Sequence, residues 1–325
     1  MKKFALILSV LLSAAACSRT PEGGQEPMPV IIETDMGNDI DDALALAVAH
    51  KAEDQGKIRI LAVGCHKLSD TPARYVDILN TYYGHPEIEI AMSETPVKEI
   101  SSYADYTAGP CDMGFTESKG GKFHEPVKLY RKLLSEAEDN SVCFVSLGFG
   151  TTLAQLLDSP ADEYSPLSGK ELVAKKARTL SIMAGSYGDK KRAEYNVIND
   201  IPAMQKVFAQ WPGEIIQNPF EIGKQAVYPC WPIEENLGFE GLNPVAEAYK
   251  LYGKMPYDRP SWDILSIVYL LRPDLFTMSP AGKISVDDKG YTHFTPDEKG
   301  RHHVLSATID QPQALKEYII EMSIK

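Results

Sequence analysis

The chain has 325 residues, of which 44% are hydrophobic and 24% are charged. This composition is typical of a soluble globular protein with one large or two small domains, and it is unlike that of a disordered or fibrous chain. The formal net charge is −12 at pH 7, which argues against a nucleic-acid backbone or an anionic membrane surface as a partner.

The first residues of the chain predict an export signal. Lys2 and Lys3 give it a basic start, and residues 4–12 form an apolar segment that is too short to span a bilayer. Three alanines at 14–16 precede Cys17, and this ending resembles a bacterial lipobox, in which the cysteine is lipidated and becomes the mature N-terminus. A plain secretory signal and a membrane anchor are the alternatives.

These features divide the chain into three parts. We expect residues 1–16 to be a signal peptide, residues 17–28 a lipidated N-terminus with a flexible polar tether, and residues 29–325 a single domain. The protein would then be exported and lipid-anchored on the periplasmic or cell-surface side of a bacterial membrane, with no other membrane contact.

Four aspartates lie within eight residues, between the first predicted strand and the first predicted helix. Residues 30–32 are apolar and β-branched, and residues 43–46 begin an apolar helix. The loop between them contains Asp35, Asp39, Asp41 and Asp42. Carboxylates this close repel one another, so the fold needs a cation beside them or a proton on one of them. All-oxygen ligands favour calcium or magnesium; an acidic solvated turn whose last Asp caps a helix is the alternative.

Strands and helices alternate along the rest of the chain. We expect strands at residues 58–64, 88–92, 142–147, 180–184 and 214–217, and helices at residues 71–83, 125–138, 151–157, 201–211, 260–271 and 314–322. This alternation predicts an α/β fold with parallel βαβ units. Residues 103–123 form a Gly-rich loop long enough to be a functional lid, and residues 284–309 predict a β-hairpin at a sheet edge.

The acidic loop resembles the N-terminal signature of the inosine-uridine-preferring nucleoside hydrolase family, Asp-Thr-Asp-x-Gly-x-Asp-Asp-Ala. Residues 34–37 (Thr-Asp-Met-Gly) and residues 41–43 (Asp-Asp-Ala) carry the resemblance. Glu33 stands where the family has its first Asp, and two extra residues separate the two halves of the motif. The resemblance implies that Asp35 and Asp42 bind calcium.

Two further segments match the family in the same order. Residues 146–154 resemble Gly-Pro-Leu-Thr-Asn-Ile-Ala, which implies that the Thr151 backbone carbonyl coordinates calcium; a helix N-cap is the alternative. Residues 193–196 (Ala-Glu-Tyr-Asn) resemble Ala-Glu-Phe-Asn, which implies that Glu194 and Asn196 bind ribose hydroxyls. On an extended segment, two side chains at this spacing would point to the same side.

A last segment, residues 259–265, places Asp263 at the head of an apolar helix, where the family has a metal-binding Asp. The histidine that precedes this Asp in the family is Trp262 here, whose indole could stack on a flat ring or pack in the core. His66 and Lys67 stand where the family has an asparagine, so His66 is a candidate ribose contact and a surface pair is the alternative.

The resemblance extends from residue 30 to about residue 270 and implies a single domain with a Rossmann-like, mostly parallel sheet flanked by helices. It also implies calcium-dependent hydrolysis of the N-glycosidic bond of ribonucleosides or related N-ribosides, which releases ribose and a base for purine or pyrimidine salvage. Calcium would be held by Asp35, Asp42, Asp263 and the Thr151 carbonyl, and Asp35 would also be the general base. Ribose would contact Asp41, Glu194, Asn196 and His66.

The absence of the family histidine keeps a second function open. A lipid-anchored protein could bind a nucleoside or ribose in the same calcium-dependent pocket without turnover. The expected partner is in both cases a small-molecule nucleoside or N-riboside and not a nucleic acid. The base and the oligomeric state, including a homo-oligomer, stay open.

Two other functions of such loops fit the residues poorly. An EF-hand starting at Asp35 would put Leu46 where a bidentate Glu belongs. Residues 148–151 lack the Gly-Lys-Ser/Thr ending of a phosphate-binding loop.

Overall fold

The structure is a computed structural model that describes residues 26–97, 106–190 and 192–325. The predicted signal peptide and Cys17 lie outside the described residues, as does the start of the predicted lid at residues 103–123. No helix in these described ranges is long and apolar enough to cross a membrane.

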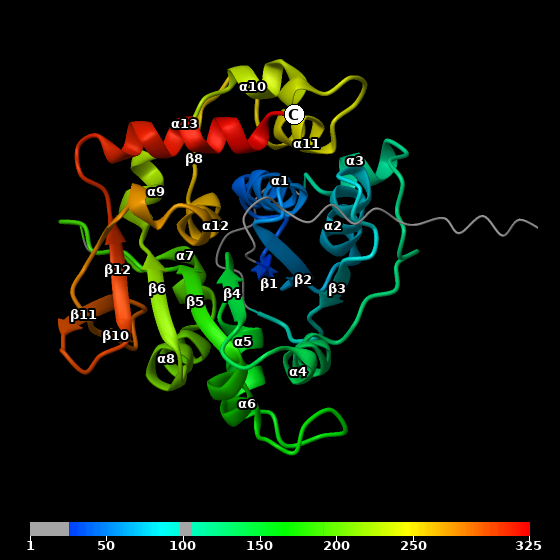
Figure 1. Ribbon diagram of the computed structural model, residues 1–325. Helices are drawn as coiled ribbons and strands as arrows, with labels where there is room; N and C mark the ends of the chain where they lie inside the picture. Colours follow the sequence, from blue (N-terminus) through cyan, green and yellow to red (C-terminus); the bar gives the residue numbers. More distant parts are fainter. Residues whose placement is uncertain (1–25, 98–105, 191) are drawn as a thin grey trace, which may run out of the picture.

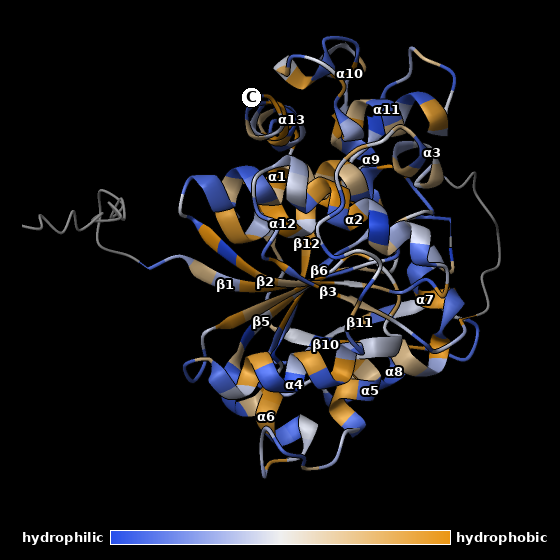
Figure 2. Ribbon diagram, turned by 90° about the vertical axis from the view of Figure 1, so that its right-hand side faces the viewer, coloured by the Kyte–Doolittle hydropathy of each residue, from blue (hydrophilic) through white to orange (hydrophobic). Residues whose placement is uncertain are grey.

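A central sheet lies between two layers of helices, as the view in Figure 2 shows. One face is covered by α1 (Asp41–Asp54), α2 (Asp70–Tyr82) and α12 (Ile264–Leu271), with α13 (Gln311–Ser323) packed over α1. The other face is covered by α4 (Pro126–Glu136), α5 (Thr151–Asp158), α6 (Gly169–Lys176) and α8 (Ile201–Gln210). This architecture confirms the predicted α/β fold class.

Ten strands of the described residues form the sheet, in the spatial order β11-β10-β12-β6-β5-β4-β1-β2-β3, with β9 paired to β12. Their bounds are β1 (Met28–Thr34), β2 (Ile58–Cys65), β3 (Glu89–Met92), β4 (Val142–Ser146), β5 (Ala177–Met183), β6 (Glu214–Asn218), β9 (Thr277–Met278), β10 (Gly282–Val286), β11 (Thr292–Pro296) and β12 (His302–Ser306). Neighbouring strands from β3 to β12 run parallel, whereas β10 is antiparallel to both β11 and β12. The predicted edge hairpin is confirmed as β10 and β11, at the left of Figure 1.

The strand order reverses between β1 and β4. From β1 the chain builds β2 and β3 on one side, and it then returns to place β4 on the other side of β1. In open α/β sheets, the crevice beyond the carboxyl ends of two such strands is the usual ligand site. The acidic loop after β1 and the turn after β4 both open into this crevice.

Helix α1 is buried on all sides from Asp41 to His50, which explains why residues 43–49 are apolar without a polar face. Residues 43–49 are each at most 1% exposed, because the sheet, the neighbouring helix α12 and the overlying helix α13 all pack against α1. A helix that is hydrophobic all round belongs in a core. Its burial fixes the position of Asp41 and Asp42 in its first turn.

Several short elements outside the central sheet were not predicted. They are α3 (Ala108–Asp112), α7 (Tyr195–Asn199), α9 (Phe220–Gln225), α10 (Trp231–Glu234), α11 (Pro244–Tyr252) and a two-stranded sheet of β7 (Val227–Tyr228) and β8 (Arg259–Pro260). The predicted start of the helix at residues 260–271 was therefore wrong. It begins at Ile264, because Arg259 and Pro260 pair with β7.

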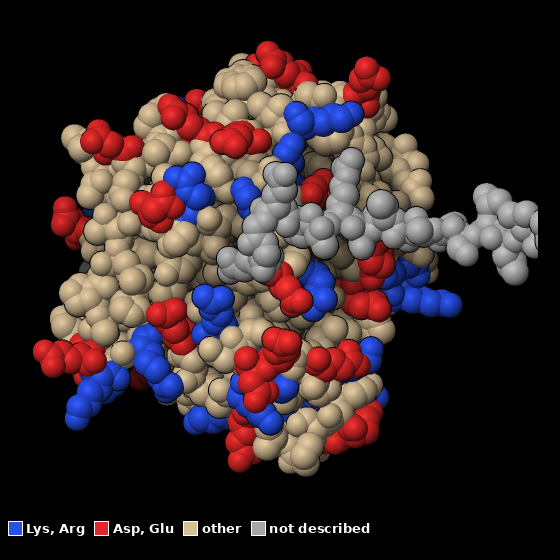
Figure 3. All heavy atoms as spheres, viewed as in Figure 1, with Lys and Arg blue, Asp and Glu red and all other residues tan. Residues whose placement is uncertain are grey.

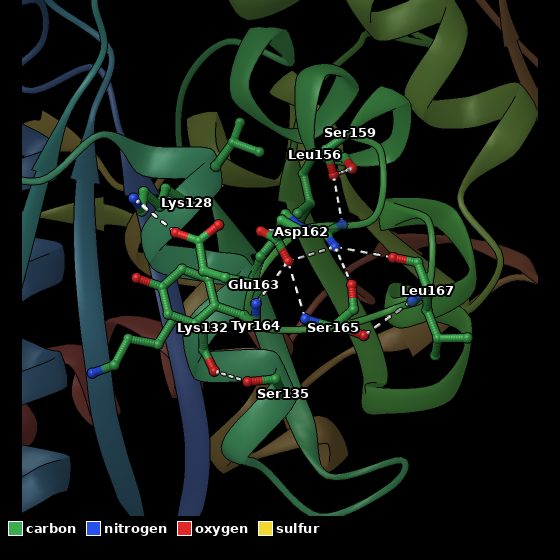
Figure 4. A network of polar contacts seen from close by, with 12 residues as sticks. Lys128, Lys132, Ser135, Leu156, Ser159, Asp162, Glu163, Tyr164, Ser165 and Leu167 are labelled. Atoms are coloured by element: carbon green, nitrogen blue, oxygen red, sulfur yellow. Dashed lines mark hydrogen bonds and ion pairs between the residues drawn. The ribbon is translucent and has the colours of Figure 1, made fainter.

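Arg131 on α4 anchors the loop between α5 and α6. Its side chain is 3% exposed, and its Nε and Nη2 donate to the two Asp162 oxygens at 2.7 and 2.9 Å. Further guanidinium hydrogen bonds reach Ser159 Oγ and the carbonyls of Ser165 and Leu167, in the network that Figure 4 shows. Hydrogen bonds from Arg131 lower the pKa of Asp162 to about 2. A buried, fully paired arginine thus holds a loop that has no helix or strand of its own.

Acidic and basic side chains are interspersed over the face seen in Figure 3. Ion pairs such as Lys128–Glu163 and Arg272–Asp274 join side chains that are largely exposed. Exposed pairs of this kind contribute at most about 1 kcal/mol each. The stability of the fold therefore depends on its buried layers rather than on surface charge.

Candidate metal and ribose site

A cleft of about 250 Å³ opens at the carboxyl edge of the sheet. Five segments distant in the sequence contribute to its wall: residues 35–41 after β1, Leu147 after β4, residues 183–196 after β5, Phe220 after β6 and residues 259–263 before α12. They meet because the carboxyl ends of parallel strands lie at one edge of a sheet.

Asp41, Asp42 and Asp263 form a buried carboxylate cluster, and two of them, Asp41 and Asp263, line the cleft. One oxygen from each residue lies within 4.8 Å of the others, and no residue is more than 5% exposed. Among the residues that the structure describes, none donates a hydrogen bond to Asp41 Oδ1 or Asp42 Oδ2. Buried anionic oxygens without a donor are costly, so the cluster fits a bound cation. Its ligand atoms are all oxygens, which suits calcium or magnesium.

Two helix starts and a threonine hydroxyl position this cluster. Asp41 begins α1, and its Oδ2 accepts a hydrogen bond at 2.9 Å from the backbone N–H of Asp263, just before α12. Thr34 Oγ1, at the end of β1, donates to Asp42 Oδ1. Burial and mutual repulsion raise the pKa of all three carboxyl groups well above the usual range. A cation would offset this repulsion and allow all three groups to ionise.

Asp35 lies beside the cluster. Its side chain is buried, lines the cleft and accepts a hydrogen bond from Asn38 Nδ2 at 2.5 Å. Burial raises the pKa of the Asp35 carboxyl, against the lowering effects of Asn38 and of the Lys67 charge. The family resemblance implied that Asp35 joins Asp42 and Asp263 at the metal and that Asp41 contacts ribose. In the structure, the third member of the group of close carboxylates is Asp41 instead of Asp35.

The turn after β4 presents Leu147 to the cleft, whereas Thr151 is not among the lining residues. Thr151 is the first residue of α5, where backbone carbonyls point along the helix axis. Its hydroxyl donates to Asp200 Oδ2 at 2.5 Å, and Asp200 is the N-cap of α8. The structure thus directs the Thr151 side chain toward α8, while Leu147 lies next to the ligand space.

Glu194 lines the cleft as the N-cap of α7, so the expected extended segment is instead a helix start. Its carboxylate accepts hydrogen bonds from the backbone N–H groups of Asn196 at 2.9 Å, Gly185 at 3.1 Å and Val197 at 3.3 Å. Burial nevertheless raises the pKa of Glu194 to about 7. The carboxyl group therefore changes its protonation state near neutral pH.

Asn196 also lines the cleft, and the protein holds its amide in one orientation. Its Nδ2 donates to the carbonyls of Leu147 at 2.9 Å and Met183 at 3.1 Å. Both amide hydrogens are thus used, and Oδ1 remains as an acceptor for a ligand. The Glu194 and Asn196 pair expected for ribose is therefore brought together, in a helical rather than an extended arrangement.

His66 belongs to a buried hydrogen-bond network below the turn after β4. Its Nδ1 accepts from the Phe149 backbone N–H at 2.9 Å, so the proton of the neutral ring lies on Nε2, which is 2.6 Å from Glu33 Oε2. The Tyr130 hydroxyl also donates to Glu33. Both ring nitrogens are engaged and His66 is only 3% exposed, so the surface-pair alternative is wrong. In this arrangement His66 offers no ring nitrogen to a ribose.

Phe220 and Trp262 form a stacked aromatic pair on the cleft wall. Their ring centroids are 5.4 Å apart with an interplanar angle of 22°, and Trp262 Nε1 donates to the Phe220 carbonyl at 3.0 Å. The Arg192 guanidinium lies over Phe220 and the Arg259 guanidinium over Trp262. Trp262 is thus part of a flat, half-buried wall rather than of the core.

Sequence analysis missed Phe220, Arg192 and Arg259. Arg259 forms a bidentate ion pair with Asp39, one of the residues of the expanded acidic motif. These two residues are 220 positions apart, so no local pattern could have indicated their contact.

The described part of the predicted lid supports the acidic loop. Tyr106 is 1% exposed, and its hydroxyl donates to the Asp39 carbonyl at 2.6 Å and accepts from the Gly37 N–H at 3.3 Å. Helix α3 then packs against α2 and α11. Residues 106–112 therefore anchor the acidic loop through a segment in which Tyr106, Thr107 and Pro110 are buried.

Comparison with known families agrees with this geometry. The sequence profile of the inosine-uridine preferring nucleoside hydrolases matches residues 30–315. The chain belongs to this nucleoside hydrolase family. A curated relative, the non-specific ribonucleoside hydrolase RihC of Escherichia fergusonii, is 28% identical over 276 residues, which cover 81% of this chain and 85% of the relative.

Solved structures show that the nucleoside hydrolase fold extends over nearly the whole chain. The purine-preferring ribonucleoside hydrolase from Gardnerella vaginalis is similar with a TM-score of 0.71 and 17% identity, covering 91% of this chain and 98% of that one. The plant nucleoside hydrolase PpNRh1 is similar with a TM-score of 0.69 and 19% identity, covering 91% and 99%. These likenesses confirm the Rossmann-like arrangement.

Proposed function

We propose that this chain is a calcium-dependent N-ribosyl hydrolase that cleaves ribonucleosides or related N-ribosides to ribose and a base. The observation that carries the proposal is the buried cluster of Asp41, Asp42 and Asp263 beside a cleft that presents Glu194 and Asn196. Two oxygens of this cluster accept no hydrogen bond from any described residue. Family membership supports the reaction class. Because the relatives are named for ribonucleosides, these compounds are the first substrates to test.

The residues around the cleft divide the chemistry between them. Calcium held by the cluster would lower the pKa of a bound water and make it a nucleophile at neutral pH. Asp35 is buried beside the cluster and lines the cleft, so it would be positioned to accept the proton of that water. Glu194 and Asn196 Oδ1 would hold ribose hydroxyls and orient the ring. A C–O bond would form at the anomeric carbon while the bond to the base nitrogen breaks, and the base would leave with the electron pair of that bond and take up a proton from solvent.

The cleft wall suggests that departure of the base depends on the base itself. Trp262 and Phe220 carry no titratable proton and can only stack on the leaving ring. We therefore expect a riboside with a nitrophenolate leaving group to be cleaved much faster than inosine, and purine ribosides to be cleaved faster than pyrimidine ribosides. Equal rates on inosine and on the activated riboside would show that another residue is an efficient acid.

Asp35→Asn tests the assignment of the base. Activity on 4-nitrophenyl riboside should fall at least about 100-fold, because general-base catalysis contributes at least that much. Circular dichroism should show an intact fold, and Glu298→Gln, which changes an exposed carboxylate, provides the matched control. Retention of more than about a tenth of the activity would contradict the assignment.

One observation favours the second candidate, a calcium-dependent binding protein. The family histidine is replaced by Trp262, and neither Trp262 nor Phe220, which stacks on it, carries a titratable proton for the leaving group. Calcium-loaded protein that binds nucleosides in calorimetry, and yet turns over neither inosine nor the activated riboside, would support this candidate.

We also propose that the protein is exported and lipid-anchored through Cys17. The proposal is supported by the basic start, the apolar segment and the three alanines of residues 1–16. Cys17→Ser should release the protein from the membrane fraction without changing its catalytic constants, and a processed mutant that stays in the membrane fraction would contradict it.

A further inference from the structure

Four side chains of the cleft wall form a row of stacked planar groups. The Arg192 Cζ lies 4.3 Å from the centroid of Phe220, Phe220 stacks on Trp262, and the Arg259 Cζ lies 5.4 Å from the centroid of Trp262. Each ring of the aromatic pair therefore has a guanidinium group over it. The stacking restrains both guanidinium groups, and each of the four side chains lines the cleft.

The two arginines differ in what balances their charge. Arg259 binds both oxygens of Asp39, so its charge is offset inside the protein. Arg192 is exposed, and among the described residues no carboxylate forms an ion pair with it. In a protein with 45 acidic residues, a stacked cation that lines a ligand cleft without a carboxylate partner is a specific feature rather than a consequence of overall charge.

The chemistry of a restrained guanidinium identifies the group that it would bind. Its planar, parallel N–H donors match the two oxygens of a carboxylate or of a phosphate, and such charge-assisted pairs are stronger than neutral hydrogen bonds. Because Glu194 and Asn196 lie in the same cleft, one ligand can in principle reach both the ribose-binding residues and Arg192.

We infer that Arg192 is a specificity-determining residue that binds an anionic substituent of the N-riboside, either a phosphate on the sugar or a carboxylate on the aglycone. The inference rests on the proposed function of the cleft as a ribose site. According to this inference the preferred substrate is an anion. The carboxylates of the cleft alone would repel such a substrate. A cation at the carboxylate cluster and the Arg192 charge together offset that repulsion.

Three ligands that share uracil and ribose test this inference. They are uridine, uridine 5′-monophosphate, and orotidine, which carries a carboxylate on the base. We expect the wild-type kcat/KM to favour at least one of the two anions over uridine by about fivefold or more. A preference for the monophosphate identifies a phosphate subsite, and a preference for orotidine identifies a carboxylate subsite.

Arg192→Ala should lower kcat/KM for the preferred anion roughly tenfold more than for uridine, mainly through KM. Arg192→Lys keeps the charge and should retain part of the preference, and the preference should shrink as ionic strength rises. Arg301→Ala removes an exposed arginine that does not line the cleft and is the matched control. It should not change the ratio of kcat/KM for the anion to that for uridine. Equal losses on all three ligands, or a wild-type preference for uridine over both anions, would overturn the inference.

Calorimetry on calcium-loaded Asp35→Asn separates this inference from the proposed function. Tighter binding of an anion than of uridine, lost on adding Arg192→Ala, supports the Arg192 site even if the wild-type protein hydrolyses no ligand, in which case only the proposed hydrolysis fails. If uridine is hydrolysed and the ratio of kcat/KM for each anion to that for uridine does not depend on Arg192, the inference is contradicted and the proposed function remains intact.

Discussion

Arg259 and Asp39 join β8 to the acidic loop through a bidentate ion pair. Arg259 Nε donates to Asp39 Oδ1 at 2.9 Å, a second hydrogen bond joins Nη2 to Oδ2, and the side chains are 25% and 24% exposed. The Asp39 carbonyl also accepts the Tyr106 hydroxyl. Asp39 is thus held from two directions, which positions the start of α1 and its two aspartates.

Removing this ion pair should show a measurable coupling energy. In a double-mutant cycle with Asp39→Asn and Arg259→Gln, we expect about 1 kcal/mol of coupling in urea unfolding, because the pair is bidentate and only partly exposed. The same cycle on Arg272 and Asp274, whose side chains are 41% and 61% exposed, should give a smaller value. Equal coupling in the two cycles would mean that the Arg259 pair does not order the loop.

Calcium should raise the unfolding temperature of the purified protein. At free calcium 100 times Kd the stabilisation is about 2.7 kcal/mol, because only the folded chain assembles the carboxylate cluster. Asp42→Asn should reduce this shift strongly, and in chelator the variant should be at least as stable as the wild type, because one buried charge has been removed. Glu298→Gln is the control, and an undiminished calcium shift in Asp42→Asn would argue against the cluster as the binding site.

The metal-free protein should lose stability as pH rises from about 4.5 to about 7, in part through Glu194. The folded-state pKa of about 7 lies above the value near 4.3 in an unfolded chain, so the folded state binds the proton more tightly. The contribution of protonated Glu194 to the free energy of unfolding is on the order of 3 kcal/mol. It is fully present below the pKa of the unfolded chain and is lost as pH rises through about 7.

Urea unfolding in chelator between pH 5 and pH 8 measures this contribution. Glu194→Gln should show a smaller decrease than the wild type, and Glu240→Gln, at an exposed position, should follow the wild type. If the free energy of unfolding changes with pH in the same way for Glu194→Gln and the wild type, Glu194 ionises normally in the folded state.

Arg131 should contribute far more to stability than its neighbour Lys128. Arg131→Ala removes the buried guanidinium hydrogen bonds to Asp162 and to two carbonyls, so we expect a loss of about 2–4 kcal/mol, whereas Lys128→Ala should cost less than about 1 kcal/mol. The pKa of Asp162 is lowered to about 2, so the Arg131 contribution is present above about pH 4 and disappears as pH falls toward 2. Similar losses in the two variants would contradict this difference.

Local patterns were sufficient to predict the sheet and most of the long helices. Strands buried on both faces have continuous apolar sequences, which is why residues 30–32 and 142–147 were correctly predicted as β1 and β4. The family motifs also located four of the residues that line the cleft after β1 and β5, namely Asp35, Asp41, Glu194 and Asn196.

Features that depend on tertiary contacts could not be predicted in this way. Glu194 is a helix N-cap although Ser, Thr, Asp and Asn are the usual residues there, so the segment gave no helix signal. His66 has both ring nitrogens engaged by groups on other segments. The stacking of Arg192 on Phe220 and the pairing of Arg259 with Asp39 join segments that only the folded sheet brings together.

The carboxylate cluster also has a topological consequence. Asp41 and Asp263 begin neighbouring helices but are separated by 222 positions, and a cation shared between them would close a loop of that length. Such a cross-link resembles a disulfide without a covalent bond, because it limits how far the two ends of the domain can separate before the ion is released. The opening of either helix from the core would therefore be coupled to loss of the ion, so the metal would make unfolding of the two halves cooperative.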